Sequence, residues 1–206
     1  MKGFPTKLLA LTFDDGPSRN ITPRILETLK KRGAHATFFE LGSCIQGNED
    51  LTKRIYAEGH AIGSHSYNHL ASASPEKALS ELEKTRALIK ACTGHSPQLF
   101  RPPYGIIKGD LHKTAIRQGY ASILWTISSA DTDAHATVAK IANNVIHTPN
   151  PGDIVLMHDS SNHDFTARAL PQILDELGAA GYKFVTLPEL FQAWDQWQSG
   201  QPKAQK

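Results

Sequence analysis

The sequence has few cysteines, no long apolar run and almost no net charge. Its two cysteines, Cys44 and Cys92, lack CxxC spacing, so we expect two buried free thiols rather than a disulfide. No run approaches the roughly 20 apolar residues that a membrane span requires. The 22 basic and 20 acidic side chains leave a net charge of +2, without a basic stripe. Neither nucleic acid nor an acidic membrane is therefore an expected partner.

The sequence also lacks a recognisable leader. A short apolar stretch at 8–13 follows Lys2, but no adequate apolar core and no small-residue cleavage site come before Asp14. We expect either a protein that works inside the cell or one whose leader has been removed. With 40% hydrophobic residues, the chain has enough apolar side chains for a core, which excludes general disorder. The length favours one domain, residues 1–198, followed by a polar tail at 199–206. We also expect a monomer, although no sequence feature specifies the oligomeric state.

Short apolar runs rich in β-forming residues alternate with segments of helical periodicity. This alternation predicts an α/β fold in which about seven parallel strands form a distorted (β/α)-type barrel. The predicted strands are 8–13, 36–41, 61–64, 99–101, 120–125, 153–158 and 183–187. The predicted helices are 22–33, 74–94, 110–118, 137–147, 166–179 and 188–197. Pro171 lies inside the fifth of these helices and is expected to displace its start.

Polar residues follow several of these strands, where α/β folds carry their chemistry. Asp14 and Asp15 end the first run, although one aspartate would suffice for a turn or a helix cap. His65 and His69 follow the third run at HxxxH spacing, so both imidazoles can reach one cation. Two histidines and a carboxylate form a ligand set typical of a catalytic Zn²⁺ or similar ion. The spare aspartate could then take a proton from water.

Three further strand ends carry charged or titratable groups. Arg101 ends the fourth run before Pro-Pro-Tyr-Gly and could hold one aspartate ionised, although a surface arginine in a turn is the plain alternative. Asp131 follows the fifth run and indicates little alone. His158 ends the sixth run, and beside a metal site it is a candidate catalyst rather than a core histidine. The other histidines have no assigned role. His163 follows His158 closely and could line the cleft, but a solvated loop is the favoured expectation.

Five strings in this order resemble the polysaccharide deacetylase family, also called carbohydrate esterase family 4 or the NodB-homology domain. They are TFDDGP at 12–17, HSYNH at 65–69, RPPYG at 101–105, LMH at 156–158 and the closing stretch at 170–187. The resemblance spans about residues 8–191. It implies metal-dependent removal of acetyl groups from a carbohydrate.

The resemblance implies roles for the base and the metal ligands. Asp14 would be the general base, and Arg101 would orient it and stabilise its charge. Asp15, His65 and His69 would bind one divalent ion, usually zinc in this family, with Co²⁺, Mn²⁺ and Ni²⁺ as alternatives.

The resemblance also implies roles for a general acid and for groups that bind the substrate. His158 would be the general acid, positioned by Asp131. The backbone N–H of Tyr104 would bind the oxyanion, and Leu156 would line the pocket for the acetyl methyl group.

One motif departs from the family pattern. Where the family commonly has a tryptophan seven residues after Trp125, this chain has Thr132, which predicts a wider or wetter pocket unless Tyr67 or Trp125 fills the gap. The expected substrates are N-acetylglucosamine-containing glycans such as peptidoglycan or chitin. An O-acetyl esterase acting on acetylxylan and a catalytically silent sugar-binding protein are the alternatives.

Overall fold

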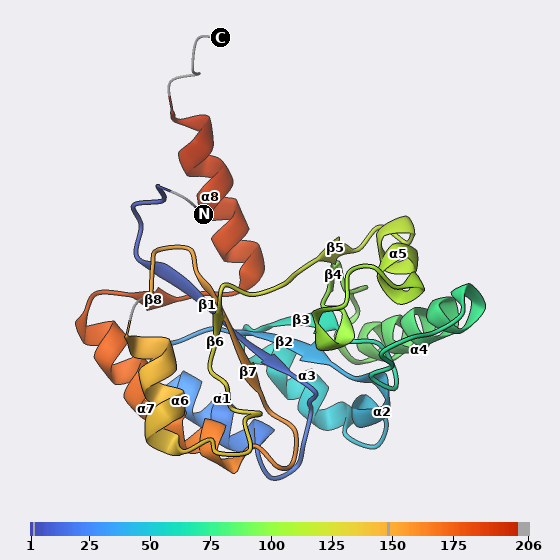
Figure 1. Cartoon of the computed structure of the whole chain (residues 1–206), viewed down its shortest axis with the longest axis horizontal. Helices are drawn as coiled ribbons and strands as arrows, with labels where there is room; N and C mark the ends of the chain where they lie inside the picture. Colours follow the sequence, from blue (N-terminus) through green and yellow to red (C-terminus); the bar gives the residue numbers. More distant parts are fainter. Residues whose placement is uncertain (2, 148, 202–206) are drawn as a thin grey trace.

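The strands of the protein form one parallel sheet that curls into an open barrel (Figure 1). The computed structural model describes residues 1, 3–147 and 149–201. The sheet order is β5-β4-β3-β2-β1-β7-β6, and β8 pairs with the start of β1. The strands are β1 (Leu8–Asp14), β2 (Thr37–Glu40), β3 (Ala61–Ser64), β4 (Leu99–Phe100), β5 (Ala121–Ser122), β6 (Ile127–Ser128), β7 (Ile154–His158) and β8 (Lys183–Phe184). The predicted parallel, barrel-type α/β fold is confirmed.

Helices cover the outside of this sheet. They are α1 (Thr22–Lys31), α2 (Gly42–Ile45), α3 (Glu49–Ala57), α4 (Pro75–Thr93), α5 (Asp110–Arg117), α6 (Val138–Ile146), α7 (Asp164–Ala179) and α8 (Leu187–Ser199), with a 3₁₀ turn η1 (Pro103–Gly105). The predicted ends of α4 are confirmed: Ser74 Oγ accepts a hydrogen bond from Lys77 N, and Gly94 closes the helix with φ 79°. The sequence analysis missed α2 and α3.

The side chains of β1 alternate between two environments, which positions the site. Leu9, Leu11 and Phe13 point outward into the main core beneath the helices. Ala10 belongs to the inner cluster, and Asp14, with the same alternation, faces the barrel interior. The strand is buried on both faces, as expected for the centre of a parallel sheet.

The strand predicted at 120–125 is confirmed only at β5, because the rest of this segment crosses the seam of the barrel. β5 pairs with β4 at one edge of the sheet, whereas β6 pairs with β7 at the opposite edge. Between them, the carbonyl oxygens of Ile123 and Leu124 accept hydrogen bonds from Arg101, at 3.4 and 3.2 Å. The side chain of Arg101 thus occupies the place that a neighbouring strand would otherwise take. Because β5 and β6 are separate, the described part of the chain has eight strands rather than the predicted seven.

The expected displacement of α7 by its proline is also wrong. The helix begins at Asp164, two residues before the predicted start, and continues through Pro171. Its buried side, which includes Leu170, Ile173 and Leu174, packs into the main core. That packing outweighs the backbone hydrogen bond that a proline removes.

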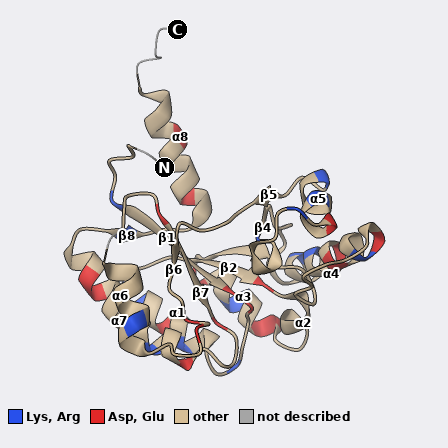
Figure 2. Ribbon diagram, viewed as in Figure 1, with Lys and Arg blue, Asp and Glu red and all other residues tan. Residues whose placement is uncertain are grey.

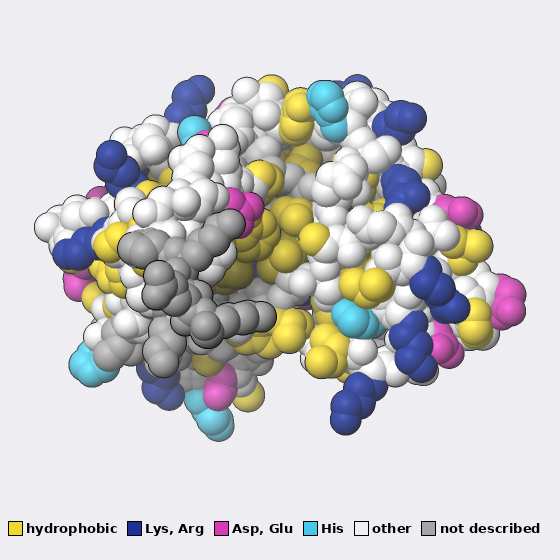
Figure 3. Space-filling model, turned by 90° about the horizontal axis from the view of Figure 1, so that it is seen from above, with side chains coloured by type: hydrophobic (Ala, Val, Ile, Leu, Met, Phe, Trp, Pro, Cys, Tyr) yellow, Lys and Arg dark blue, Asp and Glu magenta, His cyan; other side chains and the backbone are white. Residues whose placement is uncertain are grey.

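The last helix, α8, extends from the body of the molecule (Figure 1). Trp194 and Trp197 pack edge-on against Phe4, at 5.7 and 5.9 Å between ring centroids. Figure 3, viewed from this side, shows hydrophobic side chains gathered in a central hollow. Because α8 continues to Ser199, the predicted tail begins inside a helix, and 202–206 lie outside the described residues.

The distribution of charge on the surface and the state of the two cysteines can be compared with the expectations from composition. Basic and acidic residues are interspersed over the helices (Figure 2). Among the described residues, no helix is long and apolar enough to span a membrane. Cys44 and Cys92 are free, as predicted, but both are partly exposed rather than buried.

Candidate active site

The functional candidates converge on one cleft at the carboxyl ends of the strands. Asp14 ends β1 and His158 ends β7, and the parallel pairing of these strands places the two residues side by side in register. The cleft has a volume of about 420 Å³. It is lined by Asp14, Asp15, His65, His69, Pro102, Tyr104, Gly105, Trp125, Thr132, Leu156 and His158.

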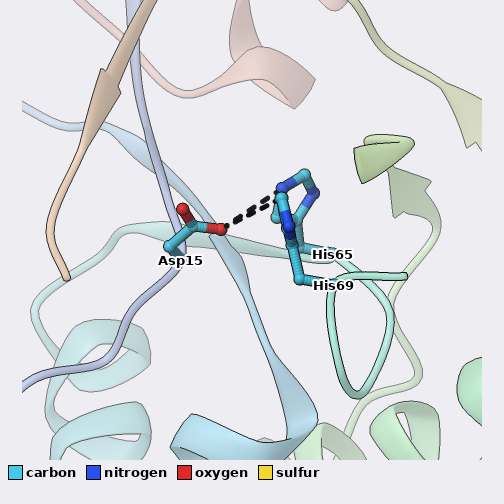
Figure 4. A group of neighbouring side chains, drawn as sticks. All are labelled: Asp15, His65 and His69. Carbon is cyan, nitrogen blue, oxygen red and sulfur yellow. Dashed lines mark ion pairs between the residues drawn. The ribbon is translucent and has the colours of Figure 1, made fainter. Parts of the chain in front are cut away.

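Asp15, His65 and His69 form a candidate metal centre (Figure 4). Asp15 Oδ1 lies 3.5 Å from Nε2 of each histidine. This buried oxygen has no hydrogen-bond partner in the described part of the chain, a costly arrangement unless another group completes it. Two imidazole nitrogens and a carboxylate oxygen are suitable ligands for a divalent ion such as Zn²⁺. The three residues therefore fit a metal ion.

His65 is held in an orientation and charge state that suit a metal ligand. Nδ1 of His65 lies 2.8 Å from the carbonyl oxygen of Arg101, which leaves Nε2 facing Asp15. Burial lowers the pKa of His65 to about 3, despite the opposing charge of Asp15. His65 is thus neutral and can offer a lone pair.

The loops that carry these ligands have unusual backbone conformations. Asp15, Ser66 and His69 adopt positive φ angles of 70°, 68° and 57°. Such conformations are uncommon for non-glycine residues and cluster at functional sites. The buried carboxylate of Glu81 supports the histidine loop by accepting hydrogen bonds from the backbone N–H groups of Tyr67 and Asn68, at 3.0 and 2.6 Å. Glu81 therefore holds in place the loop that carries the two histidines of the HxxxH motif.

Asp14 and Arg101 form a buried ion pair beside this centre. Arg101 Nη1 lies 2.7 Å from Asp14 Oδ1 and donates a second hydrogen bond of 2.7 Å to Thr12 Oγ1. Both charged side chains are at most 4% exposed. Burial raises the pKa of Asp14, whereas the charge and hydrogen bond of Arg101 lower it. A carboxylate made more basic by burial, yet held in place by a cation, is suited to accept a proton.

His158 and Asp131 form the opposite pair. Asp131 Oδ1 lies 2.9 Å from His158 Nδ1, and Asp131 Oδ2 accepts hydrogen bonds from His158 N and from Thr166 Oγ1. Burial disfavours the charged imidazole, but the hydrogen bond and charge of Asp131, with the charges of Asp14 and Asp15, outweigh it. The pKa of His158 rises to about 9. His158 is therefore protonated at neutral pH and can donate a proton.

The nine candidate residues of the sequence analysis thus lie in or beside one site, but one expectation about it is wrong. His163 is only 8% exposed, and its ring stacks on His158.

Of the two aromatic residues that could fill the gap at Thr132, Trp125 lines the same cleft as Thr132. The Tyr67 hydroxyl instead donates a hydrogen bond to Gln46.

Sequence reasoning also missed Thr12, Thr166 and Glu81. Thr12 could have been found, because it lies two residues before Asp14 on the same face of a strand. Thr166 and Glu81 carry no comparable local pattern.

A curled parallel barrel with a candidate Asp–His–His metal centre beside two charged pairs is an arrangement suited to a metal-dependent hydrolase. The chain belongs to the polysaccharide deacetylase family, whose model matches residues 2–123. It is 41% identical over 188 residues to a peptidoglycan-N-acetylglucosamine deacetylase of Bacillus cereus, covering 89% of this chain and 88% of that protein.

Solved structures of the family have the same fold. The peptidoglycan deacetylase PdaC of Bacillus subtilis is 33% identical with a TM-score of 0.87, over 95% of each chain. A CE4 family pseudoenzyme from Bacillus anthracis is 31% identical with a TM-score of 0.82, covering 91% of this chain and 66% of that one.

Proposed function

We propose that residues 1–198 hydrolyse the N-acetyl groups of N-acetylglucosamine-containing glycans, of the peptidoglycan or chitin type. The observation that carries this proposal is the presence of a buried Asp14–Arg101 pair and a protonated His158–Asp131 pair at one cleft, which Asp14 and His158 both line. Relatives whose names specify peptidoglycan deacetylation support the substrate class. Every side chain invoked comes from one chain, so a monomer is sufficient.

Asp15, His65 and His69 would hold one divalent ion, with zinc our first expectation and Co²⁺, Mn²⁺ or Ni²⁺ as alternatives. When bound, such an ion polarises the acetamide carbonyl and makes water easier to deprotonate. The neutral His65 and the unpartnered Asp15 oxygen support this assignment.

Asp14 would act as the general base. It removes a proton from the attacking water as the oxygen adds to the acetamide carbon. Arg101 keeps the Asp14 carboxylate aimed at the cleft through their 2.7 Å contact, and Thr12 fixes Arg101 in turn. The backbone N–H of Tyr104 would donate to the oxyanion, supported by the place of Tyr104 in the cleft wall at φ 56°.

His158 would act as the general acid. It gives its proton to the departing nitrogen, which would otherwise leave as a poor amide anion. Asp131 holds Nδ1 of the imidazole, so that the opposite nitrogen is free to serve the substrate. The products are acetate and a free amine on the sugar.

Leu156, Trp125 and Thr132 would receive the acetyl methyl group. All three line the cleft. The guanidinium carbon of Arg101 lies 5.8 Å from the centroid of the Trp125 ring. Gly105 leaves room for this ring, because a Cβ there would lie 3.0 Å from it. We therefore assign to Trp125 the role of apolar wall that Thr132 cannot supply.

Acetate release and free-amine formation, measured on chitin oligomers, peptidoglycan and acetylated xylan with added zinc, test this proposal. We expect both products from chitin oligomers or peptidoglycan. Acetate released from acetylated xylan alone would replace the proposal with an O-esterase. No release from any glycan, with zinc shown to be bound, would indicate a silent sugar-binding protein, as the existence of a pseudoenzyme of this fold illustrates.

A further inference from the structure

A histidine outside the predicted site packs directly against its acid. The rings of His163 and His158 are stacked, with centroids 5.1 Å apart and planes inclined by 21°. His163 is 8% exposed and precedes the first residue of α7. Nδ1 of His163 lies 2.7 Å from Ser160 Oγ, and its backbone N–H donates to Ser160 O at 3.1 Å. The imidazole is thus fixed at both its ring and its backbone.

The first turn of α7 braces the acid pair from two directions. Thr166 donates a 2.7 Å hydrogen bond to Asp131 Oδ2, while His163 covers one face of the His158 ring. Asp131 in turn accepts from both Nδ1 and the backbone N–H of His158. One turn of helix therefore sets the position of the carboxylate and closes one side of the imidazole.

The charge states favour this stack. Burial lowers the pKa of His163, and the neighbouring His158 lowers it further, against the charge of Asp131. The pair then consists of a neutral ring beneath a protonated one, and a neutral π-face attracts a cation. A stacked ring also excludes water from the covered face and limits rotation of His158 about its side-chain bonds.

We infer that His163 is a positioning residue for the proposed general acid, holding the His158 imidazole with Nδ1 on Asp131 and its other nitrogen toward the substrate. This inference rests on the proposed function only for its kinetic consequence. The ring of His163 need not exchange a proton, because its flat surface supplies the restraint. A ring without nitrogen should therefore replace it.

The comparison of His163→Ala with His163→Phe tests this inference. In His163→Ala, we expect kcat to fall between about tenfold and hundredfold with little change in KM, because a slightly misplaced group loses transition-state contacts. His163→Phe should keep most of the activity, since it retains the stacked face. His95→Ala, an exposed histidine outside the cleft, is the matched control and should leave kcat unchanged.

An NMR measurement distinguishes a positioning role of His163 from a role in folding, and its result does not depend on the proposed function. We expect the proton on Nδ1 of His158 to give a protected downfield NMR resonance in the wild type and in His163→Phe, and an exchange-broadened one in His163→Ala. An unchanged resonance and kcat in His163→Ala would overturn the inference. So would equal loss in His163→Phe, with zinc binding and melting temperature preserved. If no protein, wild type included, releases acetate, the proposed function fails while the resonance still decides the role of His163.

Discussion

At the residue scale, the two neighbouring aspartates of the site have different partners. Asp14 faces Arg101, whereas Asp15 faces two histidines and leaves an oxygen unpartnered among the described residues. We expect Asp15→Ala to lose zinc on dialysis while keeping its fold, because one of three protein ligands is removed. Metal analysis after dialysis measures this. Asp195→Ala, on the exposed side of α8, should bind zinc normally, and full zinc retention by Asp15→Ala would refute the assigned ligand.

The acid is tested separately from the metal. His158→Ala should lower kcat by about 10²- to 10⁴-fold, the usual contribution of general acid–base catalysis, while zinc stays bound. Turnover at saturating zinc, with the zinc content of the same sample, gives both quantities. Wild-type turnover in His158→Ala would remove His158 from the mechanism.

The raised pKa of His158 also predicts a pH dependence. His158 is faced by Asp131 from the loop after β6, by Asp14 and Asp15 from the end of β1, and by His163 before α7. A shift from 6.5 to about 9 corresponds to about 3 kcal/mol of stability. Because the folded pKa is raised, this contribution is complete below pH 6.5 and is lost as the pH rises through 9.

Urea unfolding of the wild type and of His158→Gln at several pH values measures this contribution. The difference in unfolding free energy between the two proteins should be constant below pH 6.5 and should shrink up to about pH 9. Turnover should fall only as the pH rises through about 9, the pKa of His158 in the folded protein, since a deprotonated His158 cannot donate. A difference that is independent of pH would contradict the assigned protonation state.

At the element scale, Arg101 joins the active site to the seam of the barrel. Its guanidinium bonds Asp14 and Thr12 of β1 as well as the carbonyl oxygens of Ile123 and Leu124 between β5 and β6. It also stacks over the Phe39 ring of β2, 4.3 Å from the ring centroid. The same side chain therefore holds Asp14, the proposed base, and completes a barrel whose outermost strands, β5 and β6, do not pair.

Removing this arginine should cost stability as well as activity. We expect Arg101→Met to lower the unfolding free energy by about 3–5 kcal/mol, because it leaves Asp14 as an unpaired buried charge. Arg19→Met, which breaks the exposed Arg19–Asp50 pair, should cost about 1 kcal/mol or less. The double variant Arg101→Met/Asp14→Asn should recover part of the loss. Equal costs for the buried and the exposed pair would contradict this account.

At the scale of the whole molecule, the succession of strands along the chain and their polar ends were predictable from the sequence. β1 and β7 are long enough for their apolar runs and terminal residues to be recognised, and carboxyl ends of parallel strands meet at one edge. The separation of β5 from β6 was not predictable, because it depends on hydrogen bonds to an arginine twenty-two residues away. The burial of His163 was not predictable either, because it comes from the packing of α7 and not from the local sequence.

The central claim is that this cleft performs metal-assisted deacetylation with its own acid and base. Titration of metal-stripped protein with zinc, while acetate release from an N-acetylglucosamine oligomer or peptidoglycan is followed, tests it most directly. We predict no release without metal and a rise that saturates near one zinc per chain, the capacity of the Asp15–His65–His69 centre. Undiminished release by the metal-free protein, or none at saturating bound zinc on any acetylated glycan, would contradict the account.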